Sequence, residues 1–240
     1  MSLAEKILKL AEQIAVKKHH APVDYDEQKI KTIDEIESSI PSGSVLMLSG
    51  TAVESRLIEE VDGTDFSHAA LMVRFHKHKN LHLWTADTVN ILPDQIKKEE
   101  DKNHPGTHLL DLRSYLASLD KIYPSPDGSK YRFAVARLKG VSVDEKKLWE
   151  TMYTYDGTPF TPTSEEFIHF IEGQLNIDSG IHNSFCAQMV ARTYQEMGWL
   201  TQKHPANYFN PGIFSKTHTI NALMQGRARL ETPEYFKLND

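Results

Sequence analysis

The sequence predicts an α+β fold, in which a small antiparallel sheet of four to six strands packs against helices. Short apolar or alternating runs, which are typical of strands, are concentrated between residues 44 and 138. Beyond Val143 the apolar residues recur at helical spacing instead. Strands followed by helices are typical of the α+β class, and 240 residues are enough for one large domain of this kind.

The first part of the chain is predicted to be a helical extension. Apolar residues recur at helical spacing from Leu3 to about Lys18, and a second helix is expected over residues 26–38. Pro41 and Gly43 then form a turn. We therefore divide the chain into an N-terminal helical extension, residues 1–40, and one domain, residues 41–240.

The strands are predicted from short runs bounded by turn residues. A helical stretch, residues 51–61, follows the first strand, and residues 113–119 form a second short helix. The charge-dense segment 93–106 is expected to be a solvated excursion. The strands themselves are expected at residues 44–49, 68–75, 81–87, 107–112 and 131–138, the second and third of these forming a hairpin.

Three helices are predicted in the second half of the chain. They cover residues 144–155, a stretch from 163 to 175 capped by Thr163 or Ser164, and a stretch from 183 to 200. Asn183 or Ser184 can cap the last helix, which places Cys186 at its second or third position.

Composition and charge exclude several classes of protein. Hydrophobic residues make up 40% and charged residues 25% of the chain, as in ordinary globular proteins. The formal net charge is -6 and the two signs are interspersed, so we expect no nucleic-acid partner. Charges interrupt the apolar positions of the first 20 residues, so we expect no signal peptide, no transmembrane segment and a cytoplasmic location.

Cys186 is the only cysteine, which excludes an internal disulfide framework and a zinc site built from several thiolates. Two readings stay open for it. Cys186 shares a helical stripe with Tyr194 and Met197, which favours packing in the core. A position in the first helical turn instead favours a reactive thiolate, because the amides there lack helical partners and the helix dipole is positive.

His68 begins an apolar strand, where a rigid sheet would hold its ring as a general base requires. A buried structural histidine is the alternative. A third group is needed to orient the ring. The next strand offers His82 on one face and Thr85 and Asp87 on the other, and alternation alone leaves open which face meets His68.

These residues suggest a family. The stretches "GSVLMLSGTAVESRLIEEVDGTDFSHAALMVRF", "LHLWTAD" and "SFCAQMVARTYQEMGWL" resemble the circularly permuted papain-like proteins of the NlpC type, in particular the YiiX-like branch, over residues 41–90 and 180–200. The resemblance implies that Cys186 is the nucleophile and His68 the base. The third residue of that branch is often glutamate, and Thr85 stands in its place, so Thr85 comes first and Asp87 second as the orienting group.

The function expected from these residues is a cysteine hydrolase, a peptidase, amidase or esterase, that works through a covalent acyl-enzyme. First-turn amides would hold the oxyanion, and Ser49, Gly50 and Ser55 would line the cleft. The expected substrate is peptide-like or an acyl small molecule, and the sequence defines neither the scissile bond nor an oligomeric state.

Three alternatives stay open. The missing glutamate favours a weak or inactive member of the same fold that binds ligands. A lipid acyltransferase or thioesterase is less favoured, because the related lipid enzymes carry Asn-Cys-Glu-His-Phe where this chain reads "FCAQMV". His76, His78 and His82 could form a metal site on the hairpin, but no nearby Asp, Glu or Cys completes it. The predicted site therefore contains no metal and no cofactor.

Overall fold

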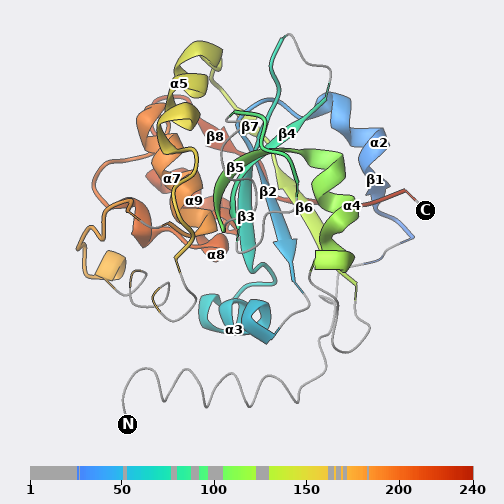
Figure 1. Cartoon of the computed structure of the whole chain (residues 1–240), viewed down its shortest axis with the longest axis horizontal. Helices are drawn as coiled ribbons and strands as arrows, with labels where there is room; N and C mark the ends of the chain where they lie inside the picture. The colour runs from blue at the N-terminus through green and yellow to red at the C-terminus, as the bar shows by residue number, and fades with distance from the viewer. Residues whose placement is uncertain are drawn as a thin grey trace.

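In this computed structural model the described part of the chain comprises residues 26, 28–50, 53–76, 80–87, 92–96, 105–122, 130–161, 165, 169, 172–182 and 184–239. The α+β class is confirmed: a central sheet is covered by helices on both faces (Figure 1). The predicted helix before residue 20 lies outside the described residues, as do Thr163, Ser164 and Asn183.

The main sheet has seven strands in the described residues, in the order β1-β9-β6-β2-β3-β4-β5. All neighbours are antiparallel except β1 and β9, which pair in parallel. The strands are β1 (Lys31–Thr32), β2 (Ser44–Ser49), β3 (His68–Val73), β4 (His82–Asp87), β5 (Gly106–Asp111), β6 (Arg132–Ala136) and β9 (Glu234–Lys237), and a separate pair is formed by β7 (Leu138–Lys139) and β8 (Arg229–Leu230).

The prediction of an antiparallel sheet of four to six strands is therefore wrong on two points, because the sheet is mixed and larger. The two strands that the sequence did not indicate are β1 and β9, and they lie together at one edge of the sheet. They span two and four residues, and such short segments give no detectable alternation. The four strands from β2 to β5 agree with their predictions within two residues.

Helices cover the two faces of the sheet separately (Figure 1). One face packs against the helices of the second half of the chain, and the other against α2 and α4. The helices are α2 (Ile33–Ile36), α3 (Val53–Asp62), α4 (Leu112–Ile122), α5 (Glu145–Tyr155), α7 (Cys186–Glu196), α8 (Pro211–Ser215) and α9 (Thr217–Leu223). We call the face that packs against α5, α7, α8 and α9 the α7 face, and the other the α4 face.

Strand alternation explains these two cores. On β3, Ala69 and Leu71 belong to the buried cluster of the α7 face, whereas Ala70 and Met72 belong to that of the α4 face. Both faces of β3 are buried, as expected of a strand whose residues are all apolar except His68 at its start. The strand thus has a single polar side chain, and it lies at one end.

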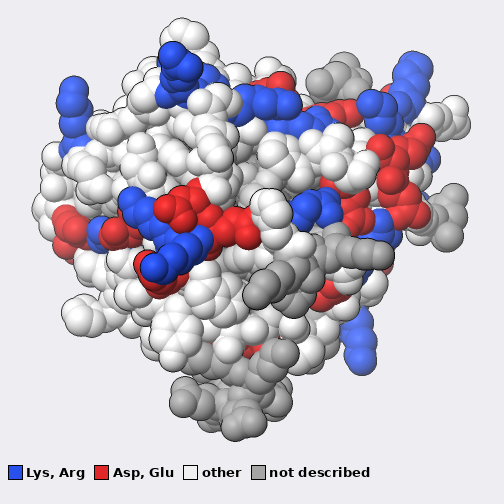
Figure 2. All heavy atoms as spheres, turned by 90° about the horizontal axis from the view of Figure 1, so that it is seen from above, with Lys and Arg blue, Asp and Glu red and all other residues white. Residues whose placement is uncertain are grey.

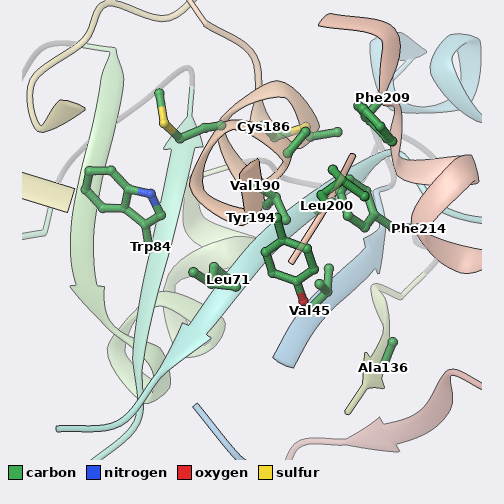
Figure 3. Packing of buried hydrophobic residues seen from close by; sticks show 14 of the residues in the cluster. Val45, Leu71, Trp84, Ala136, Cys186, Val190, Tyr194, Leu200, Phe209 and Phe214 are labelled. Atoms are coloured by element: carbon green, nitrogen blue, oxygen red, sulfur yellow. The ribbon is translucent and has the colours of Figure 1, made fainter. Parts of the chain in front are cut away.

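Helix α7 is the main element on its face, and it packs across β3 and β4. The indole of Trp84 donates a hydrogen bond of 3.1 Å to Thr193 Oγ1 on this helix. The hydroxyl of Tyr194, which is fully buried, donates to the carbonyl of Gly43 at 2.6 Å. Figure 3 shows the Tyr194 ring extending from α7 toward Val45, and it shows Trp84 on the other side of Leu71. These two bonds fix both the position and the rotation of α7.

The N-terminal region differs from its prediction. In place of a helix over residues 26–38, the described residues form β1, the single turn α2 and a short 3-10 helix, residues 37–39. Thr32 pairs with β9, so the helix begins only at the next residue, Ile33. The Thr32 amide donates a hydrogen bond of 2.7 Å to the Glu35 side chain, which caps this start. Ile33, Ile36 and Ile40 pack in the core of the α4 face. The domain boundary at residue 40 stays a prediction.

Two other segments differ locally from prediction. The expected strand over 131–138 ends at Ala136 and resumes as β7, because Arg137 leaves the ladder and forms an ion pair with Glu234. The start of the charged segment 93–106 is not a solvated excursion, since the Gln95 amide donates to the Leu109 carbonyl at 2.8 Å, on the outer edge of β5. The expected helix over 163–175 falls largely outside the described residues.

We predict that Tyr194→Phe lowers the free energy of unfolding by about 1–2 kcal/mol, because it leaves the buried Gly43 carbonyl without its donor. Urea unfolding followed by circular dichroism measures the change. The control is Tyr153→Phe on α5. Because Tyr153 is 56% exposed, this substitution should change the free energy of unfolding little. Equal stability of the two variants would contradict the role assigned to the Tyr194 bond.

Candidate active site

His68 lies at the start of β3 and forms a polar group with two residues of β4. Its Nε2 atom lies 2.8 Å from Thr85 Oγ1. Asp87 lies close enough for its charge to act on the ring, and this carboxylate accepts a hydrogen bond of 2.6 Å from the Tyr115 hydroxyl. Sequence alternation did not show which face of β4 meets His68, and the structure shows that it is the face of Thr85 and Asp87.

Strand register explains why these three side chains meet. His68 pairs with Leu48, and the β3–β4 ladder continues toward this end of the sheet, so that residues of β4 beyond Trp84 approach the start of β3. Leu48 and Tyr115 both belong to the buried cluster of the α4 face. The polar group consequently lies on the α4 face, with Tyr115 supplied by α4 itself.

Burial lowers the pKa of His68 below its ordinary value of 6.5, because desolvation disfavours the charged ring. The nearby Asp87 carboxylate acts in the opposite direction and raises this pKa, but by less. Around neutral pH the ring is therefore mainly neutral, with one nitrogen protonated and the other able to accept a proton. A neutral imidazole is the form that a general base requires.

Cys186 is the first residue of α7 and is buried, with 3% of its surface exposed. The sequence placed it one or two positions further into the helix. Phe185 takes the N-cap position instead of Ser184, since Ser184 forms a bridge with Phe160 and its hydroxyl lies 3.2 Å from Thr107 Oγ1. Cys186 is a thiol, and its position at the helix start agrees with the feature that made it a candidate nucleophile.

The start of α7 is held in place by buried polar contacts. Gln188, which is fully buried, accepts a hydrogen bond from the Phe185 amide at 3.4 Å and donates to the Gly180 carbonyl at 2.9 Å. The Ser184 amide donates to the Pro159 carbonyl at 2.9 Å. The first turn of α7 therefore has a defined position relative to β5 and to the segment that precedes the helix.

Cys186 and His68 lie at the same end of the sheet but on different faces. The start of α7 is tied to Thr107 of β5, near the end of the sheet where β3 begins, whereas Tyr194 reaches Gly43 at the opposite end. Cys186 packs in the cluster of the α7 face, and Figure 3 shows it on the helix among Val190 and other apolar side chains. His68 therefore lies with Thr85 and Asp87 on the α4 face, whereas Cys186 lies on the α7 face at the same end of the sheet.

The three predicted cleft residues cluster at this end of β2. Ser49 donates to Glu59 Oε1 at 2.9 Å and accepts from Arg132 at 2.8 Å, and all three are buried. The Gly50 amide donates to Ser67 Oγ at 2.9 Å, and a Cβ at this glycine would lie 2.2 Å from Ser55 Oγ. These groups form an internal polar network beside the start of β3, and their contact with a substrate stays a prediction.

The hairpin histidines do not converge in the described structure. His76 forms a hydrogen bond with the Glu145 carboxylate at the surface, and His82 is buried with its ring centroid 6.1 Å from that of Phe75, while His78 lies outside the described residues. A carboxylate does therefore partner His76, but it comes from α5 and not from the hairpin. A surface cavity of about 920 Å³ lies here, lined by Arg74, Phe75 and residues 38–42 and 138–143, at the end of the sheet remote from His68.

Sequence reasoning missed two features of this region. Tyr115 gave no signal, because an apolar helix position does not reveal that its hydroxyl meets a carboxylate. A buried cluster of Asp94, His108 and Asp156 was also missed, because its three members lie in segments far apart in the sequence. His108 could have been noticed as a histidine directly before two leucines in a predicted strand, much as His68 begins an apolar strand.

No family model matches the chain, and no curated protein matches it. The solved structures that match include that of the metalloprotein yiiX from Escherichia coli O157:H7, with 15% sequence identity and a TM-score of 0.44. The match covers 83% of this chain and 98% of that one. The chain is similar to this protein over most of its length, at a level that defines no shared activity.

Two further observations concern the charged side chains and the helices. On the face drawn in Figure 2, basic and acidic side chains lie next to one another in mixed groups. Among the described helices, none has the length and apolar character needed to cross a membrane.

We predict that Asp87→Asn lowers the pKa of His68 further, because it removes the negative charge that favours the protonated ring and leaves desolvation unopposed. Titration of the His68 ring protons by NMR measures the shift. Asp120→Asn on the exposed side of α4 is the control and should leave the titration unchanged. A rise in the pKa of His68 in Asp87→Asn would contradict the assigned effect.

Proposed function

We propose that the protein is a cysteine hydrolase in which Cys186 is the nucleophile and His68 the general base. The observation that carries the proposal is the hydrogen bond between His68 Nε2 and Thr85 Oγ1. It orients a mainly neutral imidazole at the end of the sheet where α7 begins with the only cysteine of the chain. An oriented base that meets a thiol at a helix start activates cysteine nucleophiles, and the proposal requires that His68 and Cys186 meet around the end of β3.

The proposed reaction uses one tautomer of His68, the one in which the ring donates to Thr85. If Nε2–H donates to Thr85 Oγ1, Nδ1 carries the lone pair and is the atom that can take a proton. In the proposed reaction Nδ1 accepts the thiol proton, Sγ attacks the substrate carbonyl, and the proton then passes to the leaving group. First-turn amides of α7 stabilise the oxyanion, and water hydrolyses the acyl-enzyme.

Thr85 and Asp87 divide the work of the missing glutamate in this proposal. Thr85 contacts the ring and orients it, whereas a neutral hydroxyl provides little stabilisation of imidazolium. Asp87 supplies the negative charge at longer range, and its bond from Tyr115 holds it in place. We therefore keep both residues as positioning groups, with Thr85 in contact and Asp87 acting through its charge.

The proposal makes one structural demand. Because Cys186 is 3% exposed and packs on the α7 face, its sulfur must reach Nδ1 around the end of β3, and the neighbouring side chains must move apart for a substrate. His68 is the first residue of β3, so no earlier strand residue separates its ring from the end of the sheet. A substrate with a small or extended acyl group, as in a peptide or an acyl ester, suits such a site.

The family relationship is part of the same proposal. It rests on the motifs around His68, Thr85 and Cys186, which resemble the permuted papain-like proteins of the NlpC type and their YiiX-like branch. Residues 41–240 would form that domain, with residues 1–40 as its extension, in a cytoplasmic protein. Acyl transfer between lipids would use the same two residues with a lipid in place of water as the acceptor, and thioester hydrolysis would use them with a thiol as the leaving group.

A second candidate is an inactive member of the fold that binds a ligand. The burial of Cys186 among Ala187, Met189 and Val190 favours it, because buried cysteines in apolar surroundings are usually inert. The same experiment separates the two functions.

We predict that the rate at which native protein reacts with iodoacetamide rises with pH, with an inflection well below ~8.5, the pKa of an ordinary cysteine. Cys186 is the only cysteine, so mass spectrometry reports its alkylation without ambiguity. His68→Gln should move the inflection toward pH ~8.5 and slow hydrolysis of a p-nitrophenyl acyl ester by about a hundredfold or more. Cys186→Ser should abolish the ester hydrolysis.

His76→Gln is the matched control, because His76 is an exposed histidine paired with Glu145 and should affect neither measurement. Native protein that resists alkylation, or that reacts with the same pH profile as urea-unfolded protein, would favour the inactive member and refute the nucleophile–base pair.

A further inference from the structure

We propose that Asp94, His108 and Asp156 bind one divalent metal ion at the outer edge of β5. Each residue offers one ligand atom, these atoms all lie within 4.8 Å of one another, and the three residues are 4%, 4% and 6% exposed. The site is distinct from the proposed nucleophile and base and does not depend on their function. It also differs from the hairpin histidines considered from sequence.

Backbone hydrogen bonds hold all three ligand-bearing segments in place. Asp94 Oδ1 accepts from the Leu109 amide at 3.1 Å and from the Ile96 amide at 3.2 Å. Residues 156–161, which we call the strap, run along β5: the Gly157 amide donates to the Thr107 carbonyl at 2.8 Å, and the Thr107 amide donates to the Thr158 carbonyl at 2.9 Å. The donors are thus brought together by the fold before any ion binds.

Charge provides the main argument for a cation. Two carboxylates buried close together repel each other, and each loses favourable hydration. The two amides that donate to Asp94 offset part of this cost, and a divalent ion, which neutral imidazole also binds, would neutralise both carboxylates. Two buried aspartates and one histidine thus supply the kinds of donor atom that such an ion binds.

The spacing agrees with a single ion. In tetrahedral zinc coordination with Zn–N and Zn–O distances of about 2.1 Å, two ligand atoms lie ~3.4 Å apart. Ligand atoms within 4.8 Å of one another therefore need movements of about 1 Å by each side chain to close around the ion. Mixed nitrogen and oxygen donors favour Zn²⁺ or a similar transition-metal ion over Mg²⁺ and Ca²⁺, which prefer oxygen alone.

The ion would link the edge of the sheet to the start of α7. Asp156 begins the strap, and further along it the Pro159 carbonyl accepts from the Ser184 amide, while the Thr161 amide donates to the Ser184 carbonyl at 3.0 Å. Ser184 lies two residues before Cys186. Because the ligands are buried, we assign the ion a structural role: it fixes the strap against β5 and so positions the first turn of α7.

The test uses the full chain, freed of any affinity tag and stripped of metal with a chelator. We expect one Zn²⁺ per chain by titration calorimetry and elemental analysis, and an increase in Tm with Zn²⁺ concentration. Asp94→Asn, His108→Gln and Asp156→Asn should each weaken Zn²⁺ binding by about a hundredfold or more, since even loss of an outer partner typically costs 10–100-fold. Glu145→Gln, which alters the exposed His76 pair, is the matched control and should bind normally.

X-ray absorption of the zinc-loaded wild-type protein keeps the proposal testable if a variant fails to fold. We expect one imidazole nitrogen and oxygen donors around zinc, and no sulfur. A zinc–sulfur distance would assign the ion to Cys186 and overturn the proposal. So would loss of binding in Glu145→Gln, normal binding in the three ligand variants, or wild-type protein that binds no Zn²⁺.

Discussion

The antiparallel register of β2 and β3 is the constraint on which the rest of the structure depends. It runs from Ser44 paired with Met72 to Leu48 paired with His68, and both strands are buried on both faces apart from His68. A slip of β3 by one residue would move each of its side chains from one core to the other. The same register places His68 on the α4 face, where Thr85 and Asp87 can reach it, and assigns Leu71 to the core beneath α7.

The β4–β5 register extends this arrangement to a second strand. Thr85 pairs with His108, so the residue that contacts the candidate base lies opposite a member of the Asp94, His108 and Asp156 cluster. Side chains paired in this way project from the same face of the sheet. A row of polar residues therefore crosses three strands of a mainly apolar sheet, from His68 through Thr85 to His108, and ends at the strap.

Local patterns were sufficient to predict the strands from β2 to β5 and helix α5, because each contains enough residues to show its period. They also singled out His68 and Cys186 as candidate site residues, since each stands out from its apolar surroundings. The edge strands β1 and β9 were not predictable, because two and four residues carry no period. Contacts between strands could not be predicted either, because they depend on register and on long-range packing. Examples are the partner of His68, the role of Tyr115 and the convergence of Asp94 with Asp156. The exact start of α7 was also missed, because Ser184 uses its polar groups for Thr107 and the strap.

The bond between Thr107 and Ser184 has a consequence for the order in which the chain acquires its structure. Strands β2 to β5 are neighbours in sequence as well as in space, whereas this bond joins residues 77 positions apart. Closing a longer loop costs more chain entropy, so contacts within the meander of β2 to β5 can form before α7 docks. During synthesis the β2 to β5 meander would then exist as a scaffold while the cysteine-bearing helix is still unattached, and the thiol would acquire its final surroundings only after these four strands have paired.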